Sequence, residues 1–110
     1  MELEFATTPL LKLCSDERGL RRTLGPAGSK KLQAHLKSLQ AASALDELRF
    51  LPGRCHELTG NRSGQLALDL PDGNRLVFEP AADPPPEKID GGLDWAAVRS
   101  VRILEISDYH

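Results

Sequence analysis

Residues 64–79 read GQLALDLPDGNRLVFE and contain two alternating runs separated by a turn. In the first run, 64–70, leucine stands at every second position from residue 66 onward, a period of two that is typical of a strand with one buried face. The turn at 71–74 consists of proline, aspartate, glycine and asparagine, and the second run, 75–79, follows it directly. The stretch therefore predicts a β-hairpin.

Further strands are expected on both sides of this hairpin. The segment 54–59 precedes it, and the apolar run 101–107 follows later in the chain. Near the start, apolar and acidic residues alternate through 2–5, which suits a short strand with one buried face. Short or irregular links between strands favour antiparallel pairing. We therefore predict a mostly antiparallel sheet of four to five strands.

The first helix is expected to begin at Thr8 and Pro9. Threonine suits the N-cap and proline suits the first helical position. Leucines then carry the helical pattern toward Gly19 or beyond. The sequence breaks at Gly25 and Pro26, two residues that punctuate helices.

A second helix is predicted over about 27–42, with leucines along one stripe and His35 among the polar residues around it. A short helical turn is expected over about 43–51, where a proline and a glycine follow. The two N-terminal helices should form a hairpin that covers one face of the sheet. The predicted fold is α+β, and the other face of the sheet is expected to remain an open concavity.

Length and composition indicate one domain over residues 1–110, large enough for a single hydrophobic core. No stretch approaches the roughly 20 apolar residues of a membrane span, and the first residues lack a signal-peptide pattern. We therefore expect a cytoplasmic protein without membrane association. Cys14 and Cys55 have no partners at metal-ligand spacing, which predicts free, buried thiols, no metal and no cofactor.

Charge is unevenly distributed, although the net charge is only −2. Residues 1–62 hold ten Lys and Arg against seven Asp and Glu, whereas residues 63–110 hold four against nine. Many of these acidic residues lie at about 80–94, where successive prolines and a glycine pair prevent a regular strand or helix. This segment is predicted to be an acidic loop insert, and Trp95 after it is expected to close one end of the core.

The chain ends in Asp108, Tyr109 and His110, which follow the apolar run 101–106. These residues place a carboxylate, a phenol and an imidazole at the end of a predicted strand. Such a cluster of proton-handling groups indicates a site, although polar chain ends are also commonly just solvated. Evidence from the rest of the sequence is needed to choose between these two interpretations.

Residues 51–65, which read LPGRCHELTGNRSGQ, together with 75–78 and the terminal Asp-Tyr-His, resemble the RelE/ParE toxin superfamily. Within it, the chain is similar to the HigB-like plasmid maintenance killer proteins over essentially its whole length. The resemblance implies helices on one side of a mostly antiparallel sheet. It also implies a type II toxin–antitoxin toxin, an endoribonuclease that cuts messenger RNA on the ribosome and inhibits translation. Its partner would be a helix-turn-helix antitoxin.

The chain holds the groups that RNA cleavage without a metal requires. Such cleavage deprotonates a ribose 2′-OH, stabilises charge on the phosphorane and protonates the departing 5′ oxygen. His56 and His110 carry imidazoles, the type of side chain that can give or take a proton near neutral pH. The alternation of the strand that contains Arg75 directs this arginine to the uncovered face. A packed strand histidine and a solvated edge charge are the structural alternatives for His56 and Arg75. The resemblance implies His56, Arg75, Asp108, Tyr109 and His110 as catalytic residues, and Arg54 and Arg62 as RNA-binding residues.

Thr59 and Ser63 stand where relatives carry lysines, so two phosphate contacts are absent. Phosphate neutralisation supplies much of the affinity for RNA, and relatives are commonly strongly basic whereas this chain is mildly acidic. Two alternatives therefore stay open. One is a ParE-like DNA gyrase inhibitor without nuclease activity. The other is a weakened toxin that acts mainly as an antitoxin-binding partner.

Overall fold

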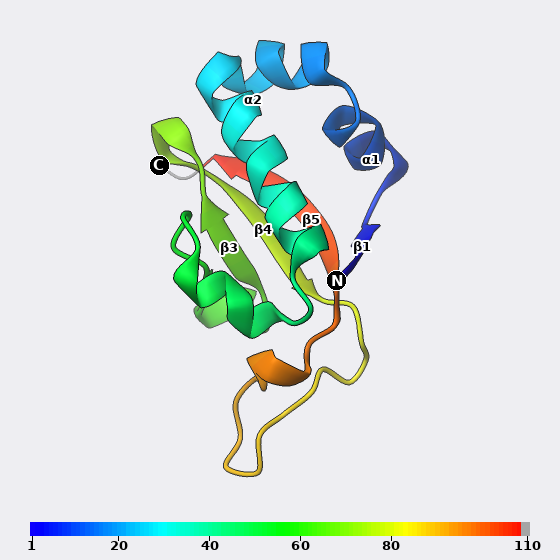
Figure 1. Cartoon of the computed structure of the whole chain (residues 1–110), viewed down its shortest axis with the longest axis vertical. Coiled ribbons are helices and arrows are strands. Elements are labelled where there is room, and N and C mark those ends of the chain that lie inside the picture. Colours follow the sequence, from blue (N-terminus) through cyan, green and yellow to red (C-terminus); the bar gives the residue numbers. More distant parts are fainter. Residues whose placement is uncertain (109–110) are drawn as a thin grey trace.

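The computed structural model describes residues 1–108 and contains a five-stranded sheet with helices along one face (Figure 1). The strands are β1 (Glu2–Phe5), β2 (His56–Glu57), β3 (Leu66–Asp69), β4 (Asn74–Pro80) and β5 (Ser100–Asp108). The helices are α1 (Thr8–Cys14) and α2 (Glu17–Ala41), and 3₁₀ turns occupy Leu45–Phe50, Gly60–Arg62, Pro71–Gly73 and Trp95–Ala97. The strand order is β1-β5-β4-β3-β2. The α+β prediction is confirmed.

The predicted hairpin is present as β3 and β4. These strands pair antiparallel, with Leu66 opposite Phe78, Leu68 opposite Leu76 and Asp69 opposite Arg75. All three leucines and the phenylalanine are fully buried. The alternation of leucine with other residues therefore identified the face of the sheet that the helices cover.

Strand β5 lies between β1 and β4. It runs antiparallel to β4 and parallel to β1, and β1 pairs only with its first residues, Ser100–Ile103. The strand expected at 54–59 is shorter than predicted, because only His56 and Glu57 pair with β3 as strand β2. Pairing stops there because Gly60–Arg62 coils into a 3₁₀ turn.

Helix α1 is shorter than the sequence predicts. Its N-cap is Thr7, whose hydroxyl accepts a hydrogen bond from the Leu10 amide at 3.2 Å, so the prediction of Thr8 was wrong by one residue. The helix ends at Cys14 rather than continuing toward Gly19. A serine and an aspartate follow, and the short polar side chains of such residues favour helix ends over helix interiors.

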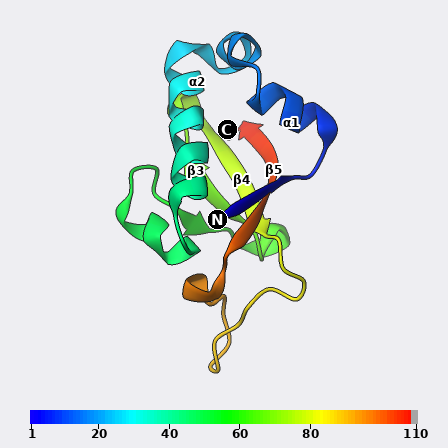
Figure 2. The same ribbon diagram turned by 45° about the vertical axis from the view of Figure 1, so that its right-hand side comes forward.

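Helix α2 contains the predicted break, but as a kink within one helix rather than as the turn of a helical hairpin. Gly25 has φ +76° and ψ 170°, outside the helical region, and the helix resumes with Pro26. Glycine adopts this conformation readily because it has no Cβ. The helix therefore changes direction at Gly25 and then runs down across the sheet (Figure 2).

The core lies between α2 and the sheet. Leu20, Leu32 and Leu39 of α2 are fully buried and belong to the same cluster as the inward residues of β3, β4 and β5. His35 was expected among the polar residues of its helix, but only 3% of it is exposed. It lies on the buried stripe, because β3 and the chain before β2 pack over it.

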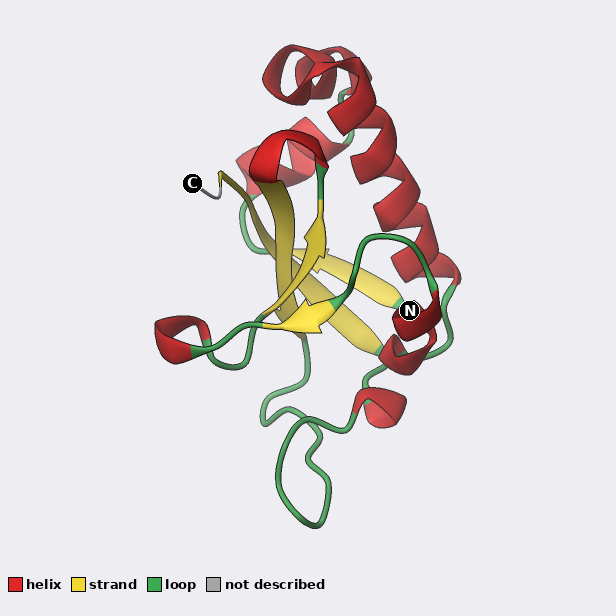
Figure 3. Ribbon diagram, turned by 90° about the vertical axis from the view of Figure 1, so that its left-hand side faces the viewer, coloured by secondary structure: helices red, strands yellow, loops and turns green. Residues whose placement is uncertain are grey.

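The acidic segment at about 80–94 protrudes beyond the end of the sheet (Figure 3). It is a loop with local pairing, since Glu87 bridges Leu93 and the Lys88 amide donates to the Gly92 carbonyl at 3.0 Å. Trp95 then closes the core, with 5% exposure, as the sequence predicts. Among the described residues, no helix combines the length and apolar character needed to cross a membrane.

Candidate active site

The sheet face opposite the helices carries the polar residues of the site in two rows. Register pairs His56 with Ala67, Ala67 with Val77 and Val77 with Glu105, so His56 and Glu105 lie on the same face. Side chains of directly paired residues share one face of a sheet. His56 therefore shares its face with a carboxylate three strands away.

The second row passes through the β3–β4 hairpin. Asp69 pairs with Arg75, and Arg75 pairs with Ser107, on the same face as the first row. Leu76 and Phe78, the alternate residues of β4, point into the core. The alternation predicted this placement of Arg75.

A cleft of about 300 Å³ opens between β2 and the end of the hairpin, and we refer to it as the His56 cleft. Its lining residues are Arg54, His56, Asp69, Leu70, Gly73, Asn74 and Arg75. Three of the residues predicted from the sequence are thus brought together from two separate segments of the chain. The cleft combines an imidazole, two guanidinium groups and a carboxylate.

One hydrogen bond fixes the tautomer of the half-buried His56. Its Nδ1 atom lies 2.7 Å from the carbonyl oxygen of Arg54. A carbonyl only accepts hydrogen bonds, so Nδ1 carries the proton and Nε2 of the neutral ring holds the free lone pair. The Nε2 atom can therefore accept a proton from a substrate hydroxyl.

The carbonyl that holds His56 belongs to a residue with unusual backbone geometry. Arg54 has φ +51°, a left-handed conformation that non-glycine residues rarely adopt, and it follows Gly53 at φ +112°. Such strained conformations concentrate at functional sites because surrounding structure has to maintain them. Here they turn the chain from the helical half of the molecule into β2.

Asp69 is a cleft residue that we did not single out from the sequence. Its carboxylate accepts two hydrogen bonds from Arg54, from Nε at 2.8 Å and from Nη2 at 3.3 Å. The strand register contains the signal. His56 pairs with Ala67 in antiparallel strands, so Asp69, two residues after Ala67, lies opposite Arg54, two residues before His56. That signal became readable only with the pairing of β2 and β3.

His35 supports the cleft from the core side. Its Nε2 lies 2.8 Å from the carbonyl oxygen of Asp69, and the Asp69 amide donates to the Gly53 carbonyl at 2.7 Å. Burial of the ring lowers the pKa of His35, so the neutral form is favoured in the fold. These bonds connect the buried face of α2 to both segments that form the cleft.

Arg62 lies outside the His56 cleft but reaches the same sheet face. Its Nη2 atom donates to Glu105 at 2.6 Å, and its Nη1 atom donates to Gln65 at 2.9 Å. Glu105 is in the row of His56. The two arginines expected to bind RNA are therefore both engaged with carboxylates of the sheet.

Asp108 is placed in a different surface feature. It pairs with Asn74 and lines a groove of about 540 Å³ on the helix side, together with Leu10, Leu13 and Ile106. Asn74 lines both this groove and the His56 cleft, so the two features adjoin at the end of β4. Tyr109 and His110 lie outside the described residues.

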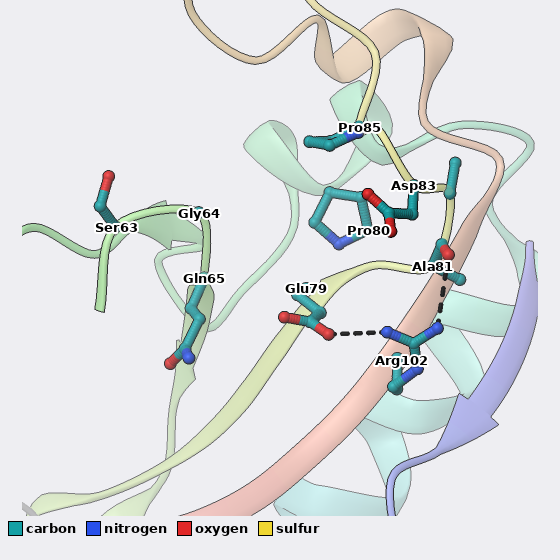
Figure 4. Close-up of a pocket in the computed structure, with 10 residues that line it drawn as sticks. Ser63, Gly64, Gln65, Glu79, Pro80, Ala81, Asp83, Pro85 and Arg102 are labelled. Atoms are coloured by element: carbon teal, nitrogen blue, oxygen red, sulfur yellow. Dashed lines mark hydrogen bonds and ion pairs between the residues drawn. The ribbon is translucent and has the colours of Figure 1, made fainter. Parts of the chain in front are cut away.

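A further cleft, of about 380 Å³, lies where the acidic loop leaves β4 (Figure 4). Its arginine, Arg102, donates to Glu79 at 2.7 Å and forms an ion pair with Glu4 at 3.2 Å. The hydrogen bond to Glu79 is the main cause of the raised pKa of Arg102. Ser63 lines this cleft and not the His56 cleft.

The described residues contain no group of three or more His, Cys, Asp or Glu side chains arranged to hold a metal ion. Cys14 and Cys55 are free thiols, as predicted, but both are only partly buried. The cleft thus presents protein groups for acid–base chemistry and for contact with anions.

No family model matches the sequence, and curated proteins give no significant match. Solved structures do match. A YoeB/ParE toxin from Agrobacterium tumefaciens superimposes with a TM-score of 0.60 at 12% identity, covering 100% of this chain and 99% of that chain. A YoeB dimer structure from Staphylococcus aureus gives 0.55 at 17% identity, covering 100% and 97%. The fold is therefore that of the YoeB/ParE toxins, as the RelE/ParE resemblance implied.

Proposed function

We propose that this chain, with its YoeB/ParE toxin fold, is the toxin of a type II toxin–antitoxin system and a metal-independent endoribonuclease. In this proposal it acts in the cytoplasm, cleaves messenger RNA on the ribosome and so inhibits translation. The observation that carries the proposal is that Arg54, His56 and Arg75 line one cleft. The cleft thus supplies a proton acceptor and two groups that can bind phosphate, which serve two of the three functions that RNA cleavage without a metal requires.

The position of Nε2 in the cleft supports our assignment of the first step to His56. Its free Nε2 accepts the proton of a ribose 2′-OH, and the resulting 2′ oxygen attacks the adjacent phosphorus. The bond from phosphorus to the 5′ oxygen of the next nucleotide then breaks, leaving a 2′,3′-cyclic phosphate. Arg75 stabilises the additional negative charge on the equatorial phosphate oxygens through its fork of donors.

The terminal residues complete the proposal. His110 is assigned as the acid that protonates the departing 5′ oxygen, and Asp108 as the carboxylate that orients it. Tyr109 is assigned to stacking on a base, which aromatic side chains do with single-stranded RNA. Arg54 and Arg62 are assigned to the RNA backbone. The place of Asp108 beside Asn74, at the border of the His56 cleft, supports a role of the chain end in this site.

The proposed partners follow from the same function. A helix-turn-helix antitoxin would hold the toxin inactive until it is degraded, and messenger RNA with the ribosome would be the substrate complex. The chain carries three more basic than acidic side chains over residues 1–62, ten against seven. An excess of basic groups in this half favours contact of the helices with ribosomal RNA.

The experiment is to add the protein to a translating lysate and to map new 5′ ends in the messages. The wild-type protein should cut them, and His56→Ala, Arg75→Ala and His110→Ala should each reduce the cleavage rate by about 100-fold or more. Arg99→Ala, at an exposed arginine in the connection before β5, is the matched control and should cut normally. Intact messages with the wild-type protein would contradict the proposal.

A second candidate function is favoured by the paired arginines and by the polar residues at positions 59 and 63. A chain with few available phosphate contacts suits a toxin that binds a protein target, such as a ParE-like inhibitor of DNA gyrase. Gyrase-mediated DNA cleavage, measured with and without the protein, separates the two functions. A weakened toxin would leave both messages and DNA intact while still binding its antitoxin.

A further inference from the structure

Both arginines proposed to hold RNA are bound to carboxylates on the sheet face that would receive it. Arg54 pairs with Asp69 at 2.8 Å, and Arg62 pairs with Glu105 at 2.6 Å. An anionic strand that approaches this face meets two ion pairs that already occupy the cations. A phosphate that uses the same guanidinium donors therefore has to displace a carboxylate.

The two members of each pair differ in how firmly the fold holds them. Asp69 and Glu105 stand in β3 and β5, inside the hydrogen-bonded sheet. Arg54 precedes β2, and Arg62 belongs to the 3₁₀ turn that follows it. The carboxylates are thus fixed in place, whereas each arginine extends from a connecting segment over the sheet.

Both pairs are accessible to water. The exposed fractions of the side chains are 69% for Arg54 and 44% for Asp69. For the second pair they are 34% for Arg62 and 44% for Glu105. Ion pairs with this exposure are weak, because water and salt screen them. A phosphate oxygen can therefore replace the carboxylate at little cost.

We propose that Asp69 and Glu105 are positioning residues that compete with RNA phosphate for Arg54 and Arg62 and thereby set the affinity of the site. This inference rests on the proposed RNA-binding function. When RNA arrives, each guanidinium exchanges a carboxylate for a phosphate oxygen, and the released carboxylate stays close to the bound phosphate. The carboxylates lower the affinity twice, through competition and through repulsion between like charges.

The test compares Asp69→Asn and Glu105→Gln with the wild-type protein. The probe is a short fluorescent single-stranded RNA with 2′-O-methyl riboses, which has no 2′-OH to react, and its binding is followed by fluorescence anisotropy. Each substitution should lower Kd by about two- to fivefold, and the double variant by about tenfold. Asp90→Asn, which removes the same charge from the exposed loop 81–94, is the control and should leave Kd unchanged.

A second measurement separates competition from a general change of charge. In the background of Arg54→Ala, the effect of Asp69→Asn on Kd should become smaller, because the arginine that it releases is absent and only the repulsion between the carboxylate and phosphate remains. The effect of Glu105→Gln should persist in that background, since it acts through Arg62. In a cleavage assay, both carboxylate variants should lower KM.

Three results would overturn the inference. The first is a Kd that stays the same or rises in both variants while their circular dichroism spectra match the wild type. The second is a gain for Asp69→Asn that is as large in the Arg54→Ala background as in the wild-type background. The third is a lack of RNA binding by all of the proteins. The proposed function would fail with it only if messages in the translating lysate also stayed intact. Cleaved messages combined with an unchanged Kd would remove the inference alone and leave the function standing.

Discussion

The ring of His35 in helix α2 is hydrogen-bonded to the carbonyl oxygen of Asp69, a residue of the candidate active site, at 2.8 Å. This bond passes from the core to the cleft through the main chain of β3. The carbonyl accepts, so Nε2 of His35 carries the proton and the neutral ring leaves Nδ1 unprotonated. Protonation of Nδ1 would place a charge in the core, with Lys31 as an unfavourable neighbour.

The first prediction concerns pH. Burial lowers the pKa of His35 in the fold, so below about pH 6.5 the unfolded chain binds a proton that the folded chain does not. The free energy of unfolding should therefore decrease as the pH falls through this value, by at most about 1.4 kcal/mol per pH unit. Urea unfolding at several pH values measures the slope.

The matched variant for this prediction is His35→Gln. Its amide can still donate to the Asp69 carbonyl, but it has no group that titrates in this range. The variant should lose the part of the pH dependence that His35 causes. The same slope in wild type and variant would show that other groups, such as exposed carboxylates, dominate.

The second prediction concerns Gly53, which touches the same ring. A Cβ at this position would lie 2.6 Å from Cε1 of His35, and φ is +112°. Gly53→Ala should therefore lower the free energy of unfolding by about 2 kcal/mol or more, because strain and overlap add. Gly64→Ala provides the control, since φ is +93° there but a Cβ would meet no atom within 4 Å other than those of its chain neighbours. Its cost should be about 1 kcal/mol, the strain contribution alone.

The third prediction uses the thiol next to His56. Burial raises the pKa of Cys55 to about 12, so almost none of it is thiolate at pH 8. Iodoacetamide should react with Cys55 of the folded protein far more slowly than with Cys55 of the protein in urea. Peptide mass spectrometry after timed alkylation measures both rates. Equal rates would mean that the segment before β2 opens readily.

The fourth prediction concerns Thr59 and Ser63, the positions where the family resemblance leads us to expect lysine. Thr59 is exposed at the end of the segment that carries His56, so Thr59→Lys should strengthen binding of single-stranded RNA by about two- to fivefold. The slope of log K against log salt should steepen by about 0.7, the value for one more phosphate contact on a single strand. Gln40→Lys, near the C-terminal end of α2, adds the same charge and should change neither the affinity for RNA nor the salt slope.

Ser63→Lys should behave differently from Thr59→Lys. Ser63 lines the cleft around Arg102, where Glu79 and Asp83 are also found. A lysine at that position would be attracted to these carboxylates and would add little to RNA binding. A gain equal to that of Thr59→Lys would show that RNA also crosses this second cleft.

The sequence predicted the elements whose signals are local. A period of two located the β3–β4 hairpin, and it directed Arg75 away from the core. Glycine and proline marked the kink of α2. The family resemblance linked His56 and Arg75, which share a cleft in the structure.

Other features depend on contacts that no local pattern contains. The burial of His35 depends on the chain around Gly53, and the role of Asp69 depends on the pairing of β2 with β3. Asp108 illustrates a further limit. Val77 pairs with Glu105 and Phe78 pairs with Ile103, so Leu104 is an extra residue in β5. Because of this β-bulge, the residues of β5 after Leu104 alternate between the two faces in the opposite order. The bulge therefore determines that Asp108 lies on the helix side of the sheet.

The parallel pairing of β1 with β5 affects the order in which the protein can assemble. Strand β5 separates β1 from β4, so until Ser100–Ile103 have been synthesised β1 has no neighbour in the sheet. Chains grow from the N-terminus at about 5–20 residues per second, and pairing of distant segments is slow. A nascent chain that lacks β5 holds Arg54 and Asp69 but not Glu105, so the pair of Arg62 with Glu105 cannot form. The complete sheet face, with both pairs, therefore forms only after β5 has been synthesised.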